Sequence, residues 1–198
     1  LISRLENPAH REALLHNLIE ESGHYGEEDL AALAKLGIEP NWIVGVPHAE
    51  LFRRFRRAVA GDDQGDEEAL EVGCWRDLLL AVLSLGSGAE AVGALGLGTE
   101  AIVPALYAPF VRALARRADL SPRDTVFFHV HTLIDDAHQA TLRRIAIDLA
   151  ATERGRLDLA RGMHKALALR DSFWSWLHER ATTPAHPLAG ADSSPQAG

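Results

Sequence analysis

The residues of this sequence that are best suited to chemistry lie in one short stretch, His131-Thr-Leu-Ile-Asp135-Asp-Ala-His138. In a helix, Asp135 would lie about 40° from His131 around the axis, and His138 about 20° to the other side. Two imidazoles and one carboxylate would then project from a single face of the helix. Imidazole and carboxylate groups together are ligands that iron and other first-row metals accept. The spacing therefore predicts a metal site.

The same helix face also carries apolar side chains and is therefore expected to point into the core; these are Phe127, Phe128, Ile134 and Leu142. Burying two imidazoles and a carboxylate without partners would cost several kcal/mol, and a bound metal ion removes that cost. A cluster of hydrogen-bonded polar groups is the alternative explanation. His129 and Asp136 fall on other faces of the helix and are interpreted as surface or supporting groups.

His48 is a further candidate ligand because it shares a helix face with apolar residues, namely Leu51, Phe52, Phe55 and Val59. This spacing of three and four residues predicts that His48 points inward at the start of its helix. A single inward histidine is more often an ordinary core residue than a metal ligand. His48 therefore becomes a candidate only together with the other groups.

Two glutamates complete the set of candidate ligands. Glu21 is expected to lean toward the apolar face of the first helix, whereas Glu20 lies about 100° away from it. Glu100 stands at the start of another helix, with Tyr107 further along its face. A glutamate at a helix start also suits the helix dipole, so neither residue identifies a site by itself.

Helix signals dominate the segments that must position these residues. Helices are predicted over 8–22, 27–36, 48–60, 68–85, a short part of 86–98, 99–118, 121–151 and 153–180. Asn7-Pro8 is typical of a helix start, and Ser121-Pro-Arg-Asp124 resembles a capping box. No hairpin signal and no clean strand alternation is found. The predicted fold class is therefore all-α, a bundle of seven to eight helices.

The composition is that of one globular domain. The chain has 198 residues, of which 47% are hydrophobic and 24% charged, and a formal net charge of −8 that argues against nucleic-acid binding. The longest mostly uncharged stretch, 78–89, is too short to span a membrane. Residues 1–180 are expected to form the domain, with 181–198 as a flexible C-terminal tail. Because Cys74 is the only cysteine and no export signal is visible, we expect a cytoplasmic location.

Taken together, the motifs resemble those of the haem-oxygenase-like diiron oxidase and oxygenase superfamily over about residues 17–177. The match is carried by Asn17-Leu-Ile-Glu20-Glu21-Ser-Gly23, His48-Ala-Glu-Leu51-Phe52, Leu95-Gly-Leu-Gly-Thr99-Glu100 and, most specifically, Phe127-Phe128-His-Val-His131-x3-Asp135-x2-His138. The segment Ala168-Leu-Arg170-Asp-Ser-Phe173-Trp174 is also similar to the last helix of that family. The resemblance implies a haem-oxygenase-like bundle that holds two irons instead of haem.

The resemblance also implies six metal ligands, which are Glu21, His48, Glu100, His131, Asp135 and His138. This sequence departs from the family pattern because 26 residues lie between Glu21 and His48, so that 27–47 is interpreted as an insertion. The insertion leaves His24 as an alternative to His48, and Glu20 as an alternative to Glu21. We prefer His48 because the family-like Leu51-Phe52 follows it.

The implied function is the use of dioxygen at reduced iron to oxidise a bound substrate. Two ferrous ions and three carboxylates would leave about one positive charge, which favours a substrate carboxylate. We therefore expect a small aliphatic amino acid or related carboxylate, oxidised by desaturation, C–H or C–N oxidation, or cyclisation in a biosynthetic pathway. A substrate pocket is predicted along the flanking residues, which are Phe52, Phe55, Val103, Tyr107, Phe128 and Ile134.

The remaining expectations concern partners and alternative functions. We expect no nucleic-acid or membrane partner, and an external reductant and a homodimer are further options. One alternative function is a metal-independent enzyme of the same fold, thiaminase-like or a cofactor-ring oxidase. Another is a non-enzymatic helical metal-binding protein. Thiaminase-like chemistry would need a nucleophilic cysteine, and Cys74 lies in an apolar helix, where packing is the more typical role.

Overall fold

The computed structural model describes residues 1–61, 68–133 and 135–183, and it leaves the side chains of 133 and 135–137 undescribed. All regular elements of this part of the chain are helical, which confirms the all-α class. The α-helices are α1 (Pro8–Glu21), α2 (Glu27–Lys35), α3 (His48–Ala60), α4 (Leu70–Leu85), α5 (Gly88–Val92), α6 (Val103–Leu114), α7 (Pro122–Leu133), α8 (Asp135–Leu149) and α9 (Glu153–Thr182). Shorter turns are η1 (Ile2–Arg4), η2 (Pro40–Trp42), η3 (Gly93–Leu97) and η4 (Glu100–Ile102). Most of the predicted tail, 184–198, lies outside the described residues.

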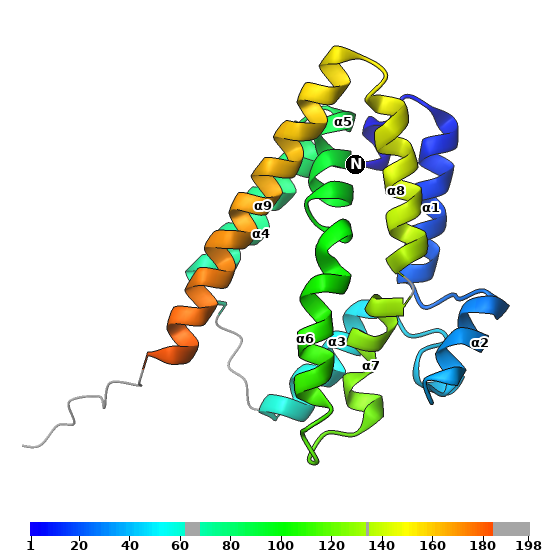
Figure 1. Cartoon of the computed structure of the whole chain (residues 1–198), viewed down its shortest axis with the longest axis vertical. Helices are drawn as coiled ribbons and strands as arrows, with labels where there is room; N and C mark the ends of the chain where they lie inside the picture. Colours follow the sequence, from blue (N-terminus) through cyan, green and yellow to red (C-terminus); the bar gives the residue numbers. More distant parts are fainter. Residues whose placement is uncertain (62–67, 134, 184–198) are drawn as a thin grey trace, which may run out of the picture.

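The helices form an elongated bundle (Figure 1). The long α9 runs along one side and contacts α5 and η3 in its first half, and α4 lies against it. On the other side, α1 and α8 lie next to each other. Helices α3, α6 and α7 pack together in the lower part of the view, with α2 beside them. The side chains predicted as ligands are carried by helices from both halves of this arrangement.

Capping hydrogen bonds confirm two of the predicted helix starts. The Asn7 side chain accepts a hydrogen bond from the Ala9 backbone N–H, as expected for an N-cap. Ser121 and Asp124 form the reciprocal pair of a capping box, because each side chain accepts from the other residue's N–H. Thr99 behaves differently: its hydroxyl donates to the Ala94 carbonyl, and α6 begins only at Val103, after the turn η4.

The glycine-rich stretch 86–98 allows two helices to pack backbone against backbone. It is helical almost throughout, as α5 followed by the π-helical η3, rather than a short helix between two turns. A Cβ atom on Gly93 would overlap the backbone oxygen of Leu159, and one on Gly162 would overlap the backbone oxygen of Glu90. Only glycine therefore permits this close crossing of α9 with α5 and η3.

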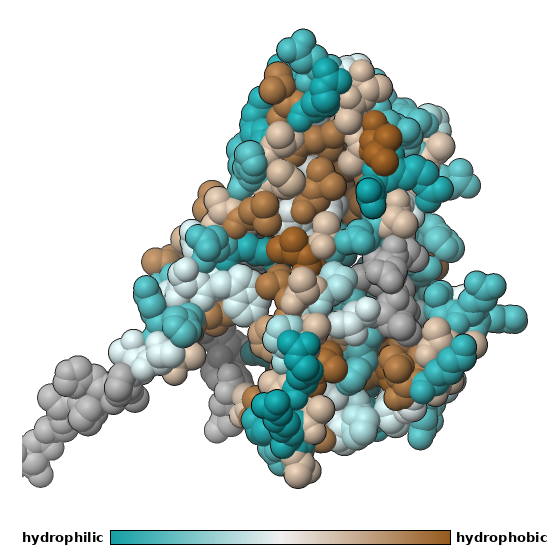
Figure 2. Space-filling model, viewed as in Figure 1, coloured by the Kyte–Doolittle hydropathy of each residue, from teal (hydrophilic) through white to brown (hydrophobic). Residues whose placement is uncertain are grey.

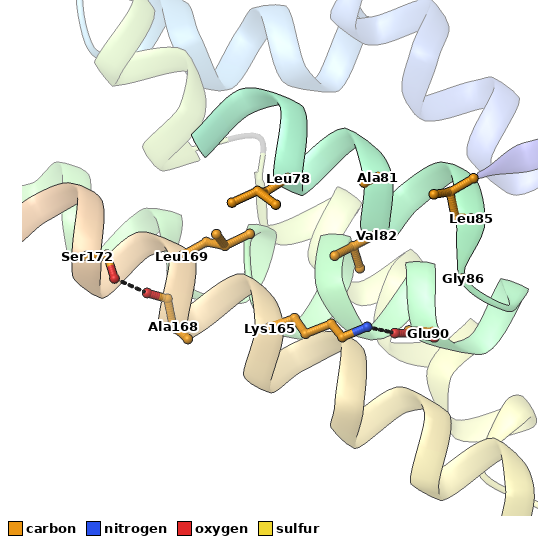
Figure 3. A pocket seen from close by; sticks show the side chains of 10 residues that line it. All are labelled: Leu78, Ala81, Val82, Leu85, Gly86, Glu90, Lys165, Ala168, Leu169 and Ser172. Carbon is orange, nitrogen blue, oxygen red and sulfur yellow. Dashed lines mark hydrogen bonds and ion pairs between the residues drawn. The ribbon is translucent and has the colours of Figure 1, made fainter. Parts of the chain in front are cut away.

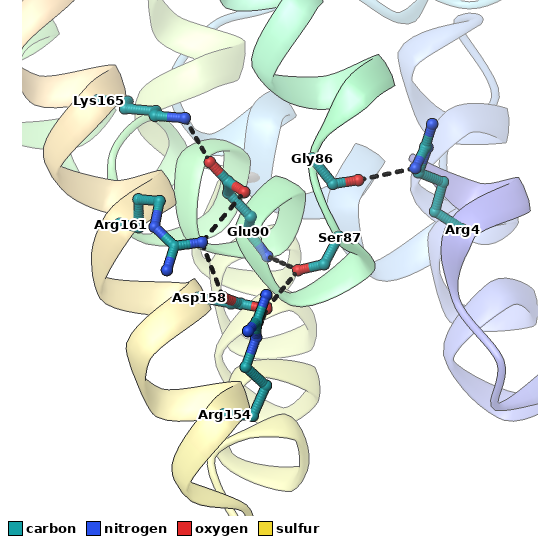
Figure 4. Close-up of polar contacts among 8 residues, drawn as sticks. All are labelled: Arg4, Gly86, Ser87, Glu90, Arg154, Asp158, Arg161 and Lys165. Atoms are coloured by element: carbon teal, nitrogen blue, oxygen red, sulfur yellow. Dashed lines mark hydrogen bonds and ion pairs between the residues drawn. The ribbon is translucent and has the colours of Figure 1, made fainter.

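A polar network fixes α9 against α5 at the same crossing (Figure 4). The buried carboxylate of Glu90 lies 2.6 Å from Lys165 Nζ. The buried Asp158 accepts hydrogen bonds from Ser87, Arg154 and Arg161 at 2.9 to 3.0 Å. Buried carboxylates need such partners. The network and the glycine contacts together set the rotation of α9 about its axis, and hence which of its residues face the bundle.

Helix is described on both sides of residue 134, as α7 and α8, so the prediction of one continuous helix over 121–151 stays a prediction at that residue. Ile134 between them lies outside the described residues. His131 is in the last turn of α7, whereas His138 is in the first turn of α8. The surroundings of the two imidazoles follow from the contacts that each ring makes with other elements.

Two hydrophobic clusters make up the core. One joins α2, α3, α7 and the loop before α3, and its largest fully buried side chains are Leu33, Ile43, Leu51, Val126 and Val130. The other joins α1, α5, α8 and α9 and includes Leu14, Val92, Leu142 and Leu159. Helix α1 belongs to the second cluster and α3 to the first. The end of α1 and the start of α3 therefore bring residues of the two clusters together.

Hydrophilic side chains cover much of the visible surface, and hydrophobic ones gather between α9 and α8 (Figure 2). By length and composition, Gly88–Leu114 is the one helical stretch among the described residues that could cross a membrane. Its packing against α9 and α8 is more typical of a core helix. An apolar groove of about 630 Å³ also runs between α4 and α9, with Lys165 and Glu90 at one end (Figure 3).

Candidate metal centre

Helix ends bring the predicted ligands together. Glu21 is the last residue of α1 and His48 the first of α3, while His131 and His138 lie near the junction of α7 and α8. One potential ligand atom each from Glu21, His48 and His131 lies within 4.8 Å of the other two. Three ligand atoms this close can bind one metal ion after small side-chain adjustments. The carboxylate of Glu21 also lies 3.7 Å from His138 Nδ1, so it stands among three imidazoles.

His48 provides the observation that best tests whether a metal ion fits. The side chain is buried, and its Nε2 lies 2.9 Å from the Tyr25 hydroxyl oxygen. Its Nδ1 lies 2.9 Å from Glu21 Oε2, but the two atoms are not aligned for a hydrogen bond, and this buried nitrogen has no hydrogen-bond partner in the part of the chain that the structure describes. Leaving such an atom unpaired is costly, and coordination of a metal ion would satisfy it. The donor set therefore fits a metal.

Glu20, the alternative to Glu21 as a predicted ligand, orients His138. Its Nε2 lies 2.5 Å from Glu20 Oε2, and both side chains are buried. With Nε2 held by a carboxylate, the Nδ1 atom is the one that faces Glu21. A carboxylate that fixes the second nitrogen of a ligating histidine is a common arrangement in metal sites. The structure therefore gives Glu20 and Glu21 different positions, with Glu20 behind His138 and Glu21 among the imidazoles.

His131 presents its other ring nitrogen to the cluster. Its Nδ1 lies 2.7 Å from the Phe127 backbone carbonyl oxygen, which can only accept, so Nδ1 carries the proton and Nε2 is free to bind a metal. Its ring packs edge-on against His48, with 4.7 Å between the ring centroids. Burial lowers the pKa of His131 to about 4, and the neighbouring His48 acts in the same direction. At neutral pH the imidazole is thus uncharged, which is the form that binds metals.

The pKa values of the two predicted glutamate ligands, Glu21 and Glu100, are shifted in opposite directions. Burial by itself raises the pKa of Glu21, but the adjacent His48 and the charges of His131 and His138 outweigh it, so the net pKa is lowered. The pKa of Glu100 is raised, first by burial and then by the negative charge of Glu21. A buried carboxylate whose charge is disfavoured by burial and by a neighbouring carboxylate is stabilised when a cation binds beside it.

A cavity of about 650 Å³ opens next to this cluster. Glu21, Glu100 and His138 supply its polar groups, and Asn17 also lines it. The rest of the wall is mainly apolar and comes from η1, α1, α8 and η3, namely Leu1, Ile2, Leu14, Leu18, Leu95 and Leu142. These residues were not among those predicted to line a pocket. The signal was present for Leu14 and Leu18, which lie on the same face of α1 as Glu21.

The residues predicted to form the substrate pocket lie elsewhere. Phe55 and Tyr107 pack edge-on against Phe128, at ring centroid distances of 4.8 and 5.3 Å, and Phe52 packs against Phe127. Val103 is buried. In the part of the chain that the structure describes, none of these five predicted residues lines the cavity next to Glu21 or the groove along α4. The four aromatic residues belong to a cluster beside His131, and the contact of all five with a substrate stays a prediction.

The remaining predicted residues are placed as follows. The backbone of Asp135 begins α8, but its side chain and Ile134 lie outside the described residues, so both assignments stay predictions. His24, the alternative to His48, is exposed beyond the end of α1. Cys74, which a thiaminase-like enzyme would need as nucleophile, is exposed on α4. Tyr25 and Glu20, which hold two of the imidazoles, were not predicted in that role.

Comparison with known proteins assigns the family. The sequence profile of a family described as iron-containing redox enzymes matches residues 1–171, which include all six predicted ligands. No curated protein and no solved structure matches the chain. The matched residues cover most of the chain and agree with the haem-oxygenase-like resemblance of its motifs. An iron-containing family also favours the metal-dependent function over the metal-independent alternative. The chain therefore belongs to the haem-oxygenase-like family of iron-containing redox enzymes.

Proposed function

We propose that this oxidoreductase binds two ferrous ions and uses dioxygen to oxidise a small aliphatic amino acid or a related carboxylate. The observation that carries the proposal is the cluster around Glu21, in which three imidazoles each have one nitrogen held by a neighbour and the other directed at the cluster. A hydrogen-bonded polar cluster would instead satisfy the buried Nδ1 of His48 within the protein. Among the described residues that nitrogen has no aligned hydrogen-bond partner, although Glu21 Oε2 lies 2.9 Å away.

The proposed ligands are Glu21, His48, Glu100, His131, Asp135 and His138. Reduced iron at this site would supply the electrons and the binding position with which dioxygen is activated. The protein's own contribution is to orient the ligands through Glu20, Tyr25 and the Phe127 carbonyl. Packing of the aromatic cluster against His131 keeps water from that side of the site. Such supporting contacts determine how firmly a metal is bound.

The substrate class follows from charge and from the shape of the cavity. Two ferrous ions and three carboxylates carry about one net positive charge, which attracts a carboxylate. The cavity beside Glu21 has polar groups at one end and leucine side chains along its wall, which suits a short aliphatic chain. Desaturation takes two electrons from such a substrate, whereas reduction of dioxygen to water takes four. An external reductant would supply the other two.

The proposal is tested by metal content and by oxygen uptake. The anaerobically loaded protein should bind two irons per chain, and aliphatic amino acids should stimulate its oxygen consumption, whereas matched amines without a carboxylate should not. His131→Ala and His138→Ala should each lower bound iron and abolish turnover. His24→Ala is the matched control because His24 is exposed, and it should retain both. Unchanged iron content in both His131→Ala and His138→Ala would disprove the metal site, and stimulation by amines alone would disprove the substrate class.

A further inference from the structure

Two contacts of α9 determine where Arg170 points. One turn before it, the Ala166 side chain packs against Gly98, where an added Cβ would lie 2.7 Å from the Ala166 Cβ. One turn after it, Trp174 packs against Phe110, with 5.8 Å between the ring centroids. Residues four apart in a helix share one face. Arg170 therefore faces the chain segment between Gly98 and Phe110, which includes Glu100 and Tyr107.

The guanidinium of Arg170 is half-buried there. Among the described residues, no side chain or backbone group forms a hydrogen bond or an ion pair with it. Burial lowers its pKa, whereas the nearby Tyr107 and Glu100 act in the opposite direction. The other cations on the inner side of α9, Arg161 and Lys165, are already paired with Asp158 and Glu90 (Figure 4). A partly desolvated guanidinium with free donors is a typical binding group for an anion.

We propose that Arg170 is the group that binds the carboxylate of the substrate, through a pair of parallel N–H···O hydrogen bonds. This assignment rests on the proposed function, because it gives the substrate carboxylate a second position besides the irons themselves. Arg170 faces the chain segment that carries Glu100, and Glu100 lines the cavity beside Glu21. A carboxylate bound by Arg170 would therefore direct its aliphatic chain toward the predicted ligands.

The alternative role for Arg170 is to support Glu100 as a metal ligand. The two roles predict different results for the same substitutions. A supporting residue affects how much iron is bound, whereas a substrate-binding residue affects carboxylate affinity and leaves iron content unchanged. The structure favours the second role because Arg170 and Glu100 form no ion pair within the described residues.

The test measures binding of small anions to the iron-free protein by calorimetry, so that its result does not depend on whether iron or oxygen chemistry occurs. The probes are pentanoate and norvaline, with pentylamine and inorganic phosphate for comparison. The variants are Arg170→Gln, which removes the charge, and Arg170→Lys, which keeps the charge but loses the planar guanidinium and its parallel pair of N–H donors. Arg180→Gln is the matched control, because Arg180 is exposed near the end of the same helix and packs over Trp176. Iron content after anaerobic loading is measured for each variant.

We expect Arg170→Gln to weaken pentanoate and norvaline binding by at least roughly tenfold, as loss of a charged hydrogen-bonded pair implies. Arg170→Lys should lie between this variant and the unsubstituted chain, and Arg180→Gln should have no effect. Iron content should be the same in all of them. The proposal is overturned if pentanoate does not bind, if its affinity is unchanged in Arg170→Gln, if phosphate binds in its place, or if Arg170→Gln and Arg170→Lys lose iron. Failure of the proposed function would instead appear as absence of iron or of oxygen uptake.

Discussion

His138 Nε2 lies 2.5 Å from Glu20 Oε2, and the two buried residues are 118 positions apart in the chain. This contact ties the start of α8 to the end of α1. It also fixes which nitrogen of His138 faces Glu21. Two adjacent glutamates at the end of one helix thereby take different roles. Glu20 orients an imidazole, and Glu21 stands where a metal would bind.

The different positions of the two glutamates predict different effects on iron binding. Glu21→Gln should abolish binding of at least one iron, because it removes the only carboxylate among the imidazoles of His48, His131 and His138 in the described cluster. Glu20→Gln should keep the stoichiometry but weaken iron affinity by about 10- to 100-fold, the usual effect of losing such a supporting carboxylate. Iron titration of both variants measures this. Equal losses of stoichiometry would mean that Glu20 is itself a ligand.

Tyr25 should support His48 without binding metal. Tyr25→Phe removes the hydroxyl 2.9 Å from His48 Nε2 but keeps the ring that stacks on the imidazole. The metal-free protein should lose about 1 kcal/mol of unfolding free energy, the typical contribution of one hydrogen bond. Iron affinity should also fall, because the imidazole is less firmly oriented. Denaturant unfolding and iron titration test this. Tyr25→Leu should lower both the unfolding free energy and the iron affinity further, because it also loses the stacking on His48. Unchanged iron affinity in Tyr25→Phe would contradict this role.

His131 should make the metal-free protein sensitive to acid. Burial lowers the pKa of His131 to about 4 in the fold, whereas an unfolded histidine has a pKa of about 6.5. Between these values the unfolded chain binds more protons, so unfolding free energy should fall as the pH decreases from about 6.5 to about 4. Above about 6.5 this group should add no pH dependence.

Urea unfolding at several pH values measures this effect. His131→Asn should flatten the slope between about pH 4 and 6.5, since asparagine does not titrate but can still donate to the Phe127 carbonyl. His178→Asn, at an exposed position of α9, is the control and should keep the slope of the unsubstituted chain. An identical slope in His131→Asn would show that other groups cause the acid sensitivity.

The close crossing of α9 over α5 should depend on glycine. A Cβ at Gly162 would overlap the backbone oxygen of Glu90, which cannot move without disturbing α5. Gly162→Ala should therefore destabilise the protein by roughly 1–3 kcal/mol, as overpacking does. Gly73→Ala is the matched control in α4, because a Cβ there meets mainly the flexible Glu68 side chain, and it should be neutral or stabilising by up to about 1 kcal/mol. Thermal unfolding of the two variants tests the difference, and equal melting temperatures would contradict it.

The sequence by itself determined the helices, most of their ends and the candidate ligands. Capping residues such as Asn7 and the Ser121–Asp124 pair act within a few residues, so their effect can be recognised locally. Apolar residues at spacings of three and four also identify the inner face of a helix without knowledge of its partner. His131 and His138 stand out for the same reason, because polar groups on an apolar face need a partner.

Only the tertiary structure decided how the ligands face each other. The contact of Glu20 with His138 and that of Tyr25 with His48 join different elements, and no periodicity within one helix determines them. The lining of the cavity by Leu1 and Ile2 likewise depends on how whole elements pack. Ring orientation in a metal site depends on the group behind each imidazole, and that group arrives from a distant part of the chain.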